Sequence, residues 1–266
     1  MKSVFYTSVT GPKGGYVHDV SKLQHPEFDF IAVHDSHHQP FPGWESINVD
    51  DTYPYDIEKY AHKQRYARML PHLFFDDYEY SVYLDPKWEL TAEFIDLCAR
   101  QVARKKSWLM PVHPNRENLV QEFLFPFCNG ALSLQECIKV IDFLAARSTD
   151  FSRFFSSLTG WLIRQHNQTN IETGERWFDL ILKCYDDNVR DQILLPFAVS
   201  DRSHIEQSLS MNQLYGCGVK MRDPNLESRL KQVDWESEIN DLLLYLRKKT
   251  GLITKLYVKP EQDFAP

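Results

Sequence analysis

The first 114 residues alternate between short apolar runs and segments whose apolar residues recur at helical spacing. The strand-like runs are SVFYTSV at 3–9, FDFIAVHD at 28–35, SINVD at 46–50, EYSVYLD at 79–85 and WLMPVHP at 108–114. Apolar residues spaced three or four apart predict a helix that begins near Tyr55 and ends near Pro71, and a second helix over 90–105. Strands that alternate with helices are typical of an α/β fold in which helices cover a central sheet.

The chain after residue 114 has mainly helical patterns. The clearest amphipathic stretch is SLQECIKVIDFLAARS at 133–148, and a short strand is expected near 158–164. A pair of helices, a loop-rich tract at 200–235 and a last helix at 235–249 follow. Because no internal repeat or linker separates these parts, we expect one domain over 1–266, composed of 1–114, 115–235 and a C-terminal helix and tail at 236–266.

Composition and charge exclude several classes of protein. The chain of 266 residues has a net charge of −7, which argues against a nucleic-acid binder because such proteins need a basic surface. Its five cysteines are odd in number and form no CxxC pair, so neither a disulfide framework nor a zinc site is indicated. The sequence shows neither a signal-peptide pattern nor an apolar stretch of the roughly 18 residues that would span a bilayer. We therefore expect a soluble, cytoplasmic protein.

Carboxylates follow three of the predicted strands. Asp35, Asp50 and Asp85 each close an apolar run, and Lys87 stands two residues beyond the last of them. In open α/β sheets, ligands bind outside the carboxyl ends of the strands, so these side chains are candidates for one site. An ordinary turn or helix-capping role is the alternative for each aspartate.

Three blocks of sequence carry a resemblance to a known family. They are RYARMLPHLFFDDYEYSVYLDPKWEL at 65–90, HPNRENLVQEF at 113–123, and RQHN with RWFDLILKCYDDNVRDQILLPF within 164–197. In their order they resemble a family of plant mucilage-related and bacterial glycosyltransferases that was long listed as a domain of unknown function. The likeness covers most of 1–200. It implies a GT-A (Rossmann-like) fold with a mixed central sheet, a UDP- or GDP-sugar donor and a glycan or glycoconjugate acceptor, with 1–114 binding the donor and 115–235 the acceptor.

The chain departs from this family at the strand end. GT-A enzymes commonly hold Mn²⁺ or Mg²⁺ on the donor diphosphate with an acidic D-x-D motif, but here the third position is Lys87. A lysine cannot bind a metal, yet its ammonium can neutralise phosphate oxygens. We therefore expect a transferase that needs no metal or depends on one only weakly, with Asp85 as the metal ligand if one binds. A merely solvated lysine is the alternative.

The resemblance and the local chemistry together suggest roles for further residues. Asp191 is the candidate catalytic base for an inverting transfer, with its neighbour Arg190 expected to keep it ionised. The competing view is that this segment is a helix start capped by Asp187 or Asn188. The expected donor-binding residues are Thr7, Asp35, Arg65, Arg68, Asp85 and Lys87. The expected acceptor- or sugar-binding residues are His113, Arg116, Arg164, His166, Asn167 and Gln192.

Other functions stay open from the sequence. A hydrolase of a glycolipid or amide bond would turn over substrate without a nucleotide sugar, and a non-catalytic carbohydrate-binding protein would bind a sugar without consuming it. The HDSHH run at 34–38 raises a zinc-hydrolase alternative, but no HExxH or HxxxH helix accompanies it. Leucines beside Arg247, Lys248, Lys249, Lys255 and Lys259 suggest packing of the last helix, or a weak peripheral contact with anionic lipid.

Overall fold

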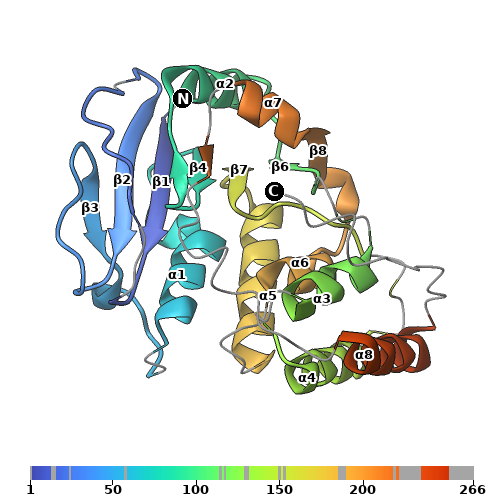
Figure 1. The fold of residues 1–266 in the computed structure, drawn as a ribbon. Coiled ribbons are helices and arrows are strands. Elements are labelled where there is room, and N and C mark those ends of the chain that lie inside the picture. Colours follow the sequence, from blue (N-terminus) through green and yellow to red (C-terminus); the bar gives the residue numbers. More distant parts are fainter. Residues whose placement is uncertain are drawn as a thin grey trace.

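The computed structural model describes residues 2–12, 16–23, 25–56, 59–113, 116, 118–128, 132–148, 151, 154–184, 190–217, 220–221 and 235–251. Within these residues a seven-stranded sheet has the order β3-β2-β1-β4-β7-β6-β8 (Figure 1). Its strands are β1 (Ser3–Val9), β2 (Phe28–His34), β3 (Glu45–Asn48), β4 (Tyr80–Leu84), β6 (Trp108–Pro111), β7 (Trp161–Gln165) and β8 (Ile205–Leu209). A separate pair joins β5 (Trp88–Glu89) to β9 (Lys220–Met221).

The sheet is mixed because one strand runs against the others. β1 pairs in parallel with β2 and β4, β2 with β3, and β6 with β8, whereas β7 is antiparallel to both of its neighbours, β4 and β6. The carboxyl ends of six strands and the start of β7 therefore share one edge of the sheet. We call this edge the carboxyl edge.

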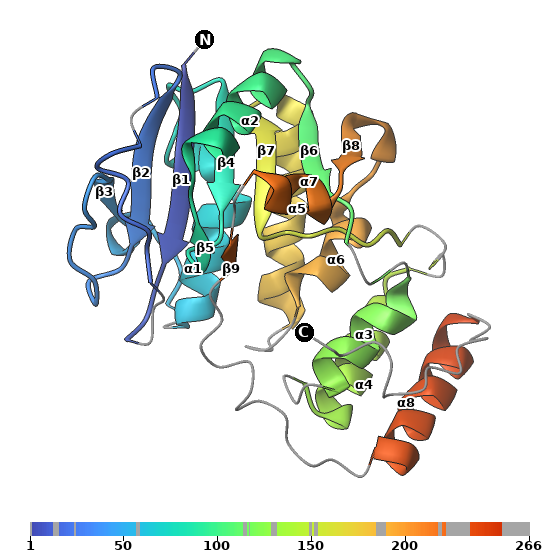
Figure 2. The same ribbon diagram turned by 45° about the horizontal axis from the view of Figure 1, so that its top comes forward.

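Helices cover both faces of the sheet. They are α1 (Tyr60–Met69), α2 (Ala92–Ala103), α3 (Leu119–Cys128), α4 (Leu134–Ala145), α5 (Gln168–Cys184), α6 (Asp191–Ala198), α7 (Met211–Gly216) and α8 (Trp235–Thr250). Figures 1 and 2 show α3, α4 and α8 as a helical group beyond α5 and α6. The predicted fold class, a mixed α/β sheet flanked by helices with a mainly helical C-terminal part, is confirmed.

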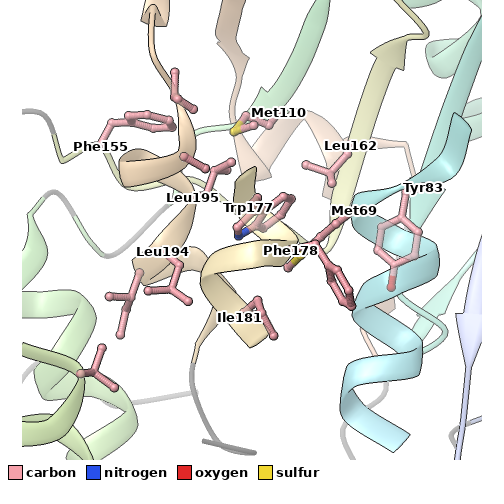
Figure 3. Close-up of a cluster of buried hydrophobic side chains, with 14 of the residues drawn as sticks. Met69, Tyr83, Met110, Phe155, Leu162, Trp177, Phe178, Ile181, Leu194 and Leu195 are labelled. Atoms are coloured by element: carbon pink, nitrogen blue, oxygen red, sulfur yellow. The ribbon is translucent and has the colours of Figure 1, made fainter. Parts of the chain in front are cut away.

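Successive side chains of a strand point to opposite faces of the sheet, so a hydrophobic core forms on each face. On β1, Val4 and Tyr6 join the core under α1, α5 and α6, whereas Phe5 and Val9 join the core under α2. Both faces are buried, so the strands read as nearly continuous apolar runs, as in parallel sheets covered by helices. Figure 3 shows part of the first core around Trp177 and Phe178 of α5.

Three differences from the predicted elements have local reasons. The predicted strand at 46–50 ends at Asn48, whose side chain accepts from Asp50 N and caps a short 3-10 helix at Val49–Asp51. The loop-rich tract at 200–235 contains β8 and α7, because the edge strand β8 buries only its two end residues and shows little apolar pattern. The helix α6 begins at Asp191 with Arg190 as its N-cap residue, whereas the expected capping residues, Asp187 and Asn188, lie outside the described residues.

The last helix uses its leucines for packing. Leu242 and Leu246 of α8 are fully buried in the first core, and Asp142 of α4 accepts from Tyr245 and pairs with Lys249 at 2.7 Å. Lys255 and Lys259 lie outside the described residues. Among the described helices, none is long and apolar enough to cross a membrane.

Candidate active site at the carboxyl edge

Asp85 directly follows β4, the central strand, and therefore lies at the centre of the carboxyl edge. Its backbone N–H donates to Gly160 O at 2.8 Å, which ties it to the residue before β7. A side chain at Gly160 would place its Cβ 2.7 Å from Asp85 Oδ2, so only glycine leaves room for the carboxylate. Tyr83 fixes the other oxygen by donating to Oδ1 at 2.7 Å. The sequence predicted a carboxylate here, and its precise orientation comes from these two neighbours.

Arg68 connects Asp85 to Asp191. It lies near the end of α1 and is only 7% exposed. Helical side chains lean toward the helix N-terminus, which brings this one back over the carboxyl edge. Its Nη1 lies 3.5 Å from Asp85 Oδ1, and its Nη2 forms an ion pair with Asp191 Oδ2. One guanidinium therefore bridges two carboxylates from distant parts of the chain.

Asp191 is the first residue of α6 and is buried. Thr159 donates to its Oδ2 at 3.1 Å, and the indole of Trp177 donates to its backbone oxygen at 2.9 Å. Burial by itself raises the pKa of the Asp191 carboxyl, but the charges of Arg68 and Arg65 outweigh burial and hold the pKa below its ordinary value. Asp191 is therefore ionised at neutral pH.

Lys87 lies beside Asp85 on the side that faces solvent. Its Nζ lies 3.9 Å from Asp85 Oδ2, and its side chain is 44% exposed. Arg65, one helical turn before Arg68, is partly buried, and its charge acts on Asp191. We call Arg65, Arg68, Asp85, Lys87 and Asp191 the Arg68 cluster.

The residues around Asp85 do not fit a divalent cation. Its Oδ1 already accepts from Tyr83 and lies beside Arg68, and its Oδ2 faces Lys87. Mg²⁺ and Mn²⁺ need several oxygen ligands, whereas this position offers one carboxylate between two cationic side chains. Among the described residues, no group of three or more His, Cys, Asp or Glu side chains is placed to hold a metal ion.

A second charged cluster lies beyond the end of β6. Arg116 pairs with the fully buried Glu122 of α3, whose Oε2 also accepts from Ser156 at 3.3 Å. Burial raises the pKa of Glu122, although Arg116 beside it acts in the opposite direction. Burial, together with the charges of Arg116 and Arg190, lowers the pKa of His113 to about 3, so this imidazole is neutral at physiological pH. We call His113, Arg116, Glu122 and Arg190 the Arg116 cluster.

The segment 156–160 joins the two clusters. Ser156 binds Glu122, Thr159 binds Asp191, and Gly160 lies against Asp85. Gln192 supports this segment by donating to Ser157 O at 3.1 Å. The Gln192 side chain is thus engaged with the backbone next to Asp191, and its contact with a sugar stays a prediction.

Arg190 contributes less to the ionisation of Asp191 than the sequence suggested. The sequence suggested that Arg190 keeps Asp191 ionised, but the ion pair is made by Arg68, and Arg190 acts on Asp191 more weakly. Arg190 is the residue before α6, and its charge acts both on Asp191 and on Arg116 of the second cluster.

Asp35 and Thr7 lie apart from the Arg68 cluster. Asp35 is fully buried and accepts from Gly11 N at 2.6 Å and His37 N at 3.2 Å, so it holds the turns after β1 and β2 together. Thr7 is buried on the same face of the sheet as Phe5, opposite to Arg68. The turn role for Asp35 is therefore present in the structure, and a contact of either residue with the donor stays a prediction.

Arg164, His166 and Asn167 lie at the opposite edge of the sheet. The reason is that β7 is antiparallel, so its end falls where the parallel strands begin. Arg164 is 2% exposed and its guanidinium donates to Met69 O, Arg68 O and Tyr6 Oη, which caps the end of α1. These three residues therefore lie away from Asp191, and the binding of an acceptor or sugar by them stays a prediction.

His166 and Asn167 have structural partners of their own. The ring Nδ1 of His166 donates to Phe75 O at 3.1 Å, and Asn167 Oδ1 accepts from Asn170 N at 3.0 Å in the first turn of α5. Sequence reasoning also missed Tyr83, Thr159, Gly160, Trp177 and Glu122. Gly160 had the clearest signal, because it is a glycine within the strand predicted near 158–164, where a glycine suggests a close approach of another group.

No family model matches the sequence, and no curated protein matches it. Several solved glycosyltransferase structures are similar in fold. Mouse xyloside xylosyltransferase 1 is 8% identical with a TM-score of 0.45, covering 78% of this chain and 85% of that one. The mannosyltransferase Ktr4p of S. cerevisiae is 10% identical with a TM-score of 0.44, covering 78% and 68%.

The galactosyltransferase LgtC, solved in complex with donor and acceptor sugar analogs, is 10% identical with a TM-score of 0.43, covering 94% of this chain and 98% of that one. Because each of these TM-scores is below 0.5, we base the function on the chemistry of the two clusters.

Proposed function

We propose that this chain is a glycosyltransferase that moves a sugar from a nucleotide-sugar donor to a saccharide or glycoconjugate acceptor. The observation that carries the proposal is the composition of the Arg68 cluster. Three cations, Arg65, Arg68 and Lys87, meet two carboxylates there, although the whole chain has a net charge of −7. Cationic side chains at the carboxyl ends of an α/β sheet suit a pyrophosphate.

Lys87 would take the first role in donor binding. Its ammonium is exposed and lies beside Asp85, so it can reach phosphate oxygens without leaving the turn after β4. Positive charge at this position stabilises the nucleoside diphosphate as it departs, and it does so without a metal ion. A UDP- or GDP-sugar has the required diphosphate.

Asp191 would act as the general base. A diphosphate is a strong bidentate partner for a guanidinium, so donor binding draws Arg68 toward the phosphates and uncovers the carboxylate of Asp191. The acceptor hydroxyl then gives its proton to Asp191 while its oxygen bonds to the anomeric carbon. The bond from that carbon to the diphosphate breaks at the same time, and configuration is inverted.

Calorimetry with UDP, GDP and their sugars, followed by measurement of nucleotide release, tests this proposal. Lys87→Ala should weaken binding of the best nucleotide, whereas Asp191→Asn should bind it normally and abolish transfer. Arg247→Gln, which removes an exposed charge from α8, should change neither quantity. Binding of none of these compounds by the wild-type chain would refute the proposal.

A non-catalytic carbohydrate-binding protein is the second candidate. It is favoured because Asp85 and Asp191 both lie against Arg68, so each carboxylate already has a cationic partner. It predicts nucleotide or sugar binding without nucleotide release. A hydrolase predicts the reverse, which is turnover of a glycoconjugate in the absence of any nucleotide sugar.

A weak peripheral membrane contact is proposed only for the outer side of α8. Leu244 is 63% exposed there, and Arg247 and Lys248 are exposed nearby. Flotation with vesicles that contain anionic lipid tests this contact, and Leu244→Glu should abolish any binding that is found. Absence of binding by the wild-type chain would leave packing as the role of this helix.

A further inference from the structure

The guanidinium of Arg190 has no direct partner among the described residues. This side chain is partly buried at the start of α6, yet it forms no hydrogen bond or ion pair with any residue that the structure describes. Its charge nevertheless acts on Asp191, Glu122 and Arg116, so it lies between the two clusters. A partly buried guanidinium that no described acceptor engages keeps its donors available for an anionic ligand.

Arg116 adds a second donor of the same kind. This side chain is only 6% exposed, and although one of its terminal nitrogens pairs with Glu122, its Nε is buried without a hydrogen-bond partner. The two arginines face a single carboxylate in the Arg116 cluster, and His113 contributes no negative charge. The cluster therefore has an excess of positive charge that its own residues do not balance.

We propose that Arg190 and Arg116 form an anion subsite that binds a carboxylate or phosphate group of the acceptor. This inference rests on the proposed function, because it places an acceptor next to Asp191. Arg190 directly precedes Asp191 in the chain, so a substrate anchored by its anionic group on Arg190 presents neighbouring hydroxyls to the base. Guanidinium groups recognise both carboxylates and phosphates through paired hydrogen bonds. The acceptor class is thus an acidic or phosphorylated sugar.

The donor diphosphate is the other source of an anion at this subsite. Its expected position is the Arg68 cluster, where Lys87 and Asp85 follow β4, whereas Arg116 and Glu122 lie beyond β6 and on α3. β7 separates β4 from β6 in the sheet. This separation favours two anion sites, one for each substrate.

Calorimetry with three named probes tests the subsite. Glucose, glucuronate and glucose 6-phosphate differ in charge at one position, and each is titrated into the protein with and without saturating UDP. The wild-type chain should bind one of the two anionic sugars at least about tenfold more tightly than glucose. Arg190→Gln should abolish that preference and leave the affinity for UDP unchanged, Arg190→Lys should restore part of it, and Arg247→Gln should behave as wild type.

Two results would overturn the subsite. One is equal binding of all three sugars by the wild-type chain. The other is a loss of UDP affinity in Arg190→Gln as large as the loss for the anionic sugars, which would assign Arg190 to the donor diphosphate. The readout needs no turnover, so a preference for anionic sugars in a chain that binds no nucleotide would refute the transferase and keep the subsite.

Discussion

Arg68 of α1 and Asp191 of α6 form an ion pair whose side chains are only 8% and 11% exposed. The pair joins two helices on one face of the sheet, and Trp177 of α5 holds the backbone of Asp191 from the other side. Arg68 also lies over the rings of Tyr83 and Trp177, at 5.6 and 6.0 Å from its guanidinium carbon. The candidate site and the packing of these helices therefore depend on the same side chain.

Replacing Arg68 by glutamine should destabilise the fold. The change leaves Asp191 buried without its counter-charge, and breaking a buried pair on one side typically costs roughly 3–5 kcal/mol. Urea unfolding at pH 7 measures the loss, and Arg247→Gln serves as the control because surface substitutions usually stay within about 0.5 kcal/mol. An unchanged free energy of unfolding in Arg68→Gln would contradict the buried pair.

Lys87→Asp should create a dependence on metal that the wild-type chain lacks. The substitution puts a second carboxylate beside Asp85 and removes the cation that opposes a metal there. We expect EDTA to leave the UDP affinity of the wild-type chain unchanged. In Lys87→Asp we expect weak binding that Mn²⁺ restores. If EDTA abolished UDP binding by the wild-type chain and Mn²⁺ restored it, Lys87 would not replace a metal ion in binding the diphosphate.

Gly160→Ala should disturb Asp85 without changing any charge. The new Cβ would lie 2.7 Å from Asp85 Oδ2, so the carboxylate or the turn before β7 must shift, at a cost of about 1–3 kcal/mol in stability. UDP affinity should fall with it. Gly216→Ala is the matched control, because a Cβ at Gly216 meets no atom within 4 Å. Equal effects of the two variants would mean that the close approach at Gly160 has no influence.

Acid should destabilise the protein partly through His166. Burial, followed by the charge of Arg164, lowers the pKa of His166 to about 4, whereas the unfolded chain titrates near 6.5. The unfolded state therefore binds more protons between these values, so the free energy of unfolding falls as pH drops from about 6.5 to 4, by up to roughly 1.4 kcal/mol per pH unit for this group. His166→Gln should make the pH dependence shallower. An NMR titration in which the His166 ring protonates near pH 6.5 would disprove the shift.

Much of the Arg68 cluster could be predicted because its signals are local. The apolar run at 79–85 places Asp85 at a strand end, and the spacing of three places Arg65 and Arg68 on one side of a helix. Parallel strands then bring their ends to the same edge. The charge reversal at Lys87 was visible in the sequence, and its ammonium does lie beside Asp85.

The unexpected position of Arg164 and His166 comes from the direction of β7. Its sequence has the same strand-like character in either direction, so the run that ends at Arg164 and His166 looked like another strand feeding the site. Pairing antiparallel to β4 sends those side chains to the opposite edge, where they hold α1 and α5. The sequence also could not show whether Arg190 or Arg68 pairs with Asp191, because the spacing of residues along one helix does not determine its contacts with another helix.

The sequence by itself determined the alternating elements, the acidic strand end at Asp85 and its cationic neighbour, since hydrophobic periodicity and strand termini are properties of short segments. Only the tertiary structure decided that Arg68 bridges Asp85 and Asp191, that Gly160 makes room for a carboxylate, and that the Arg190 guanidinium has no direct partner among the described residues. These relationships join residues far apart in the chain, and they exist only once both faces of the sheet have been buried and the strand directions have been fixed.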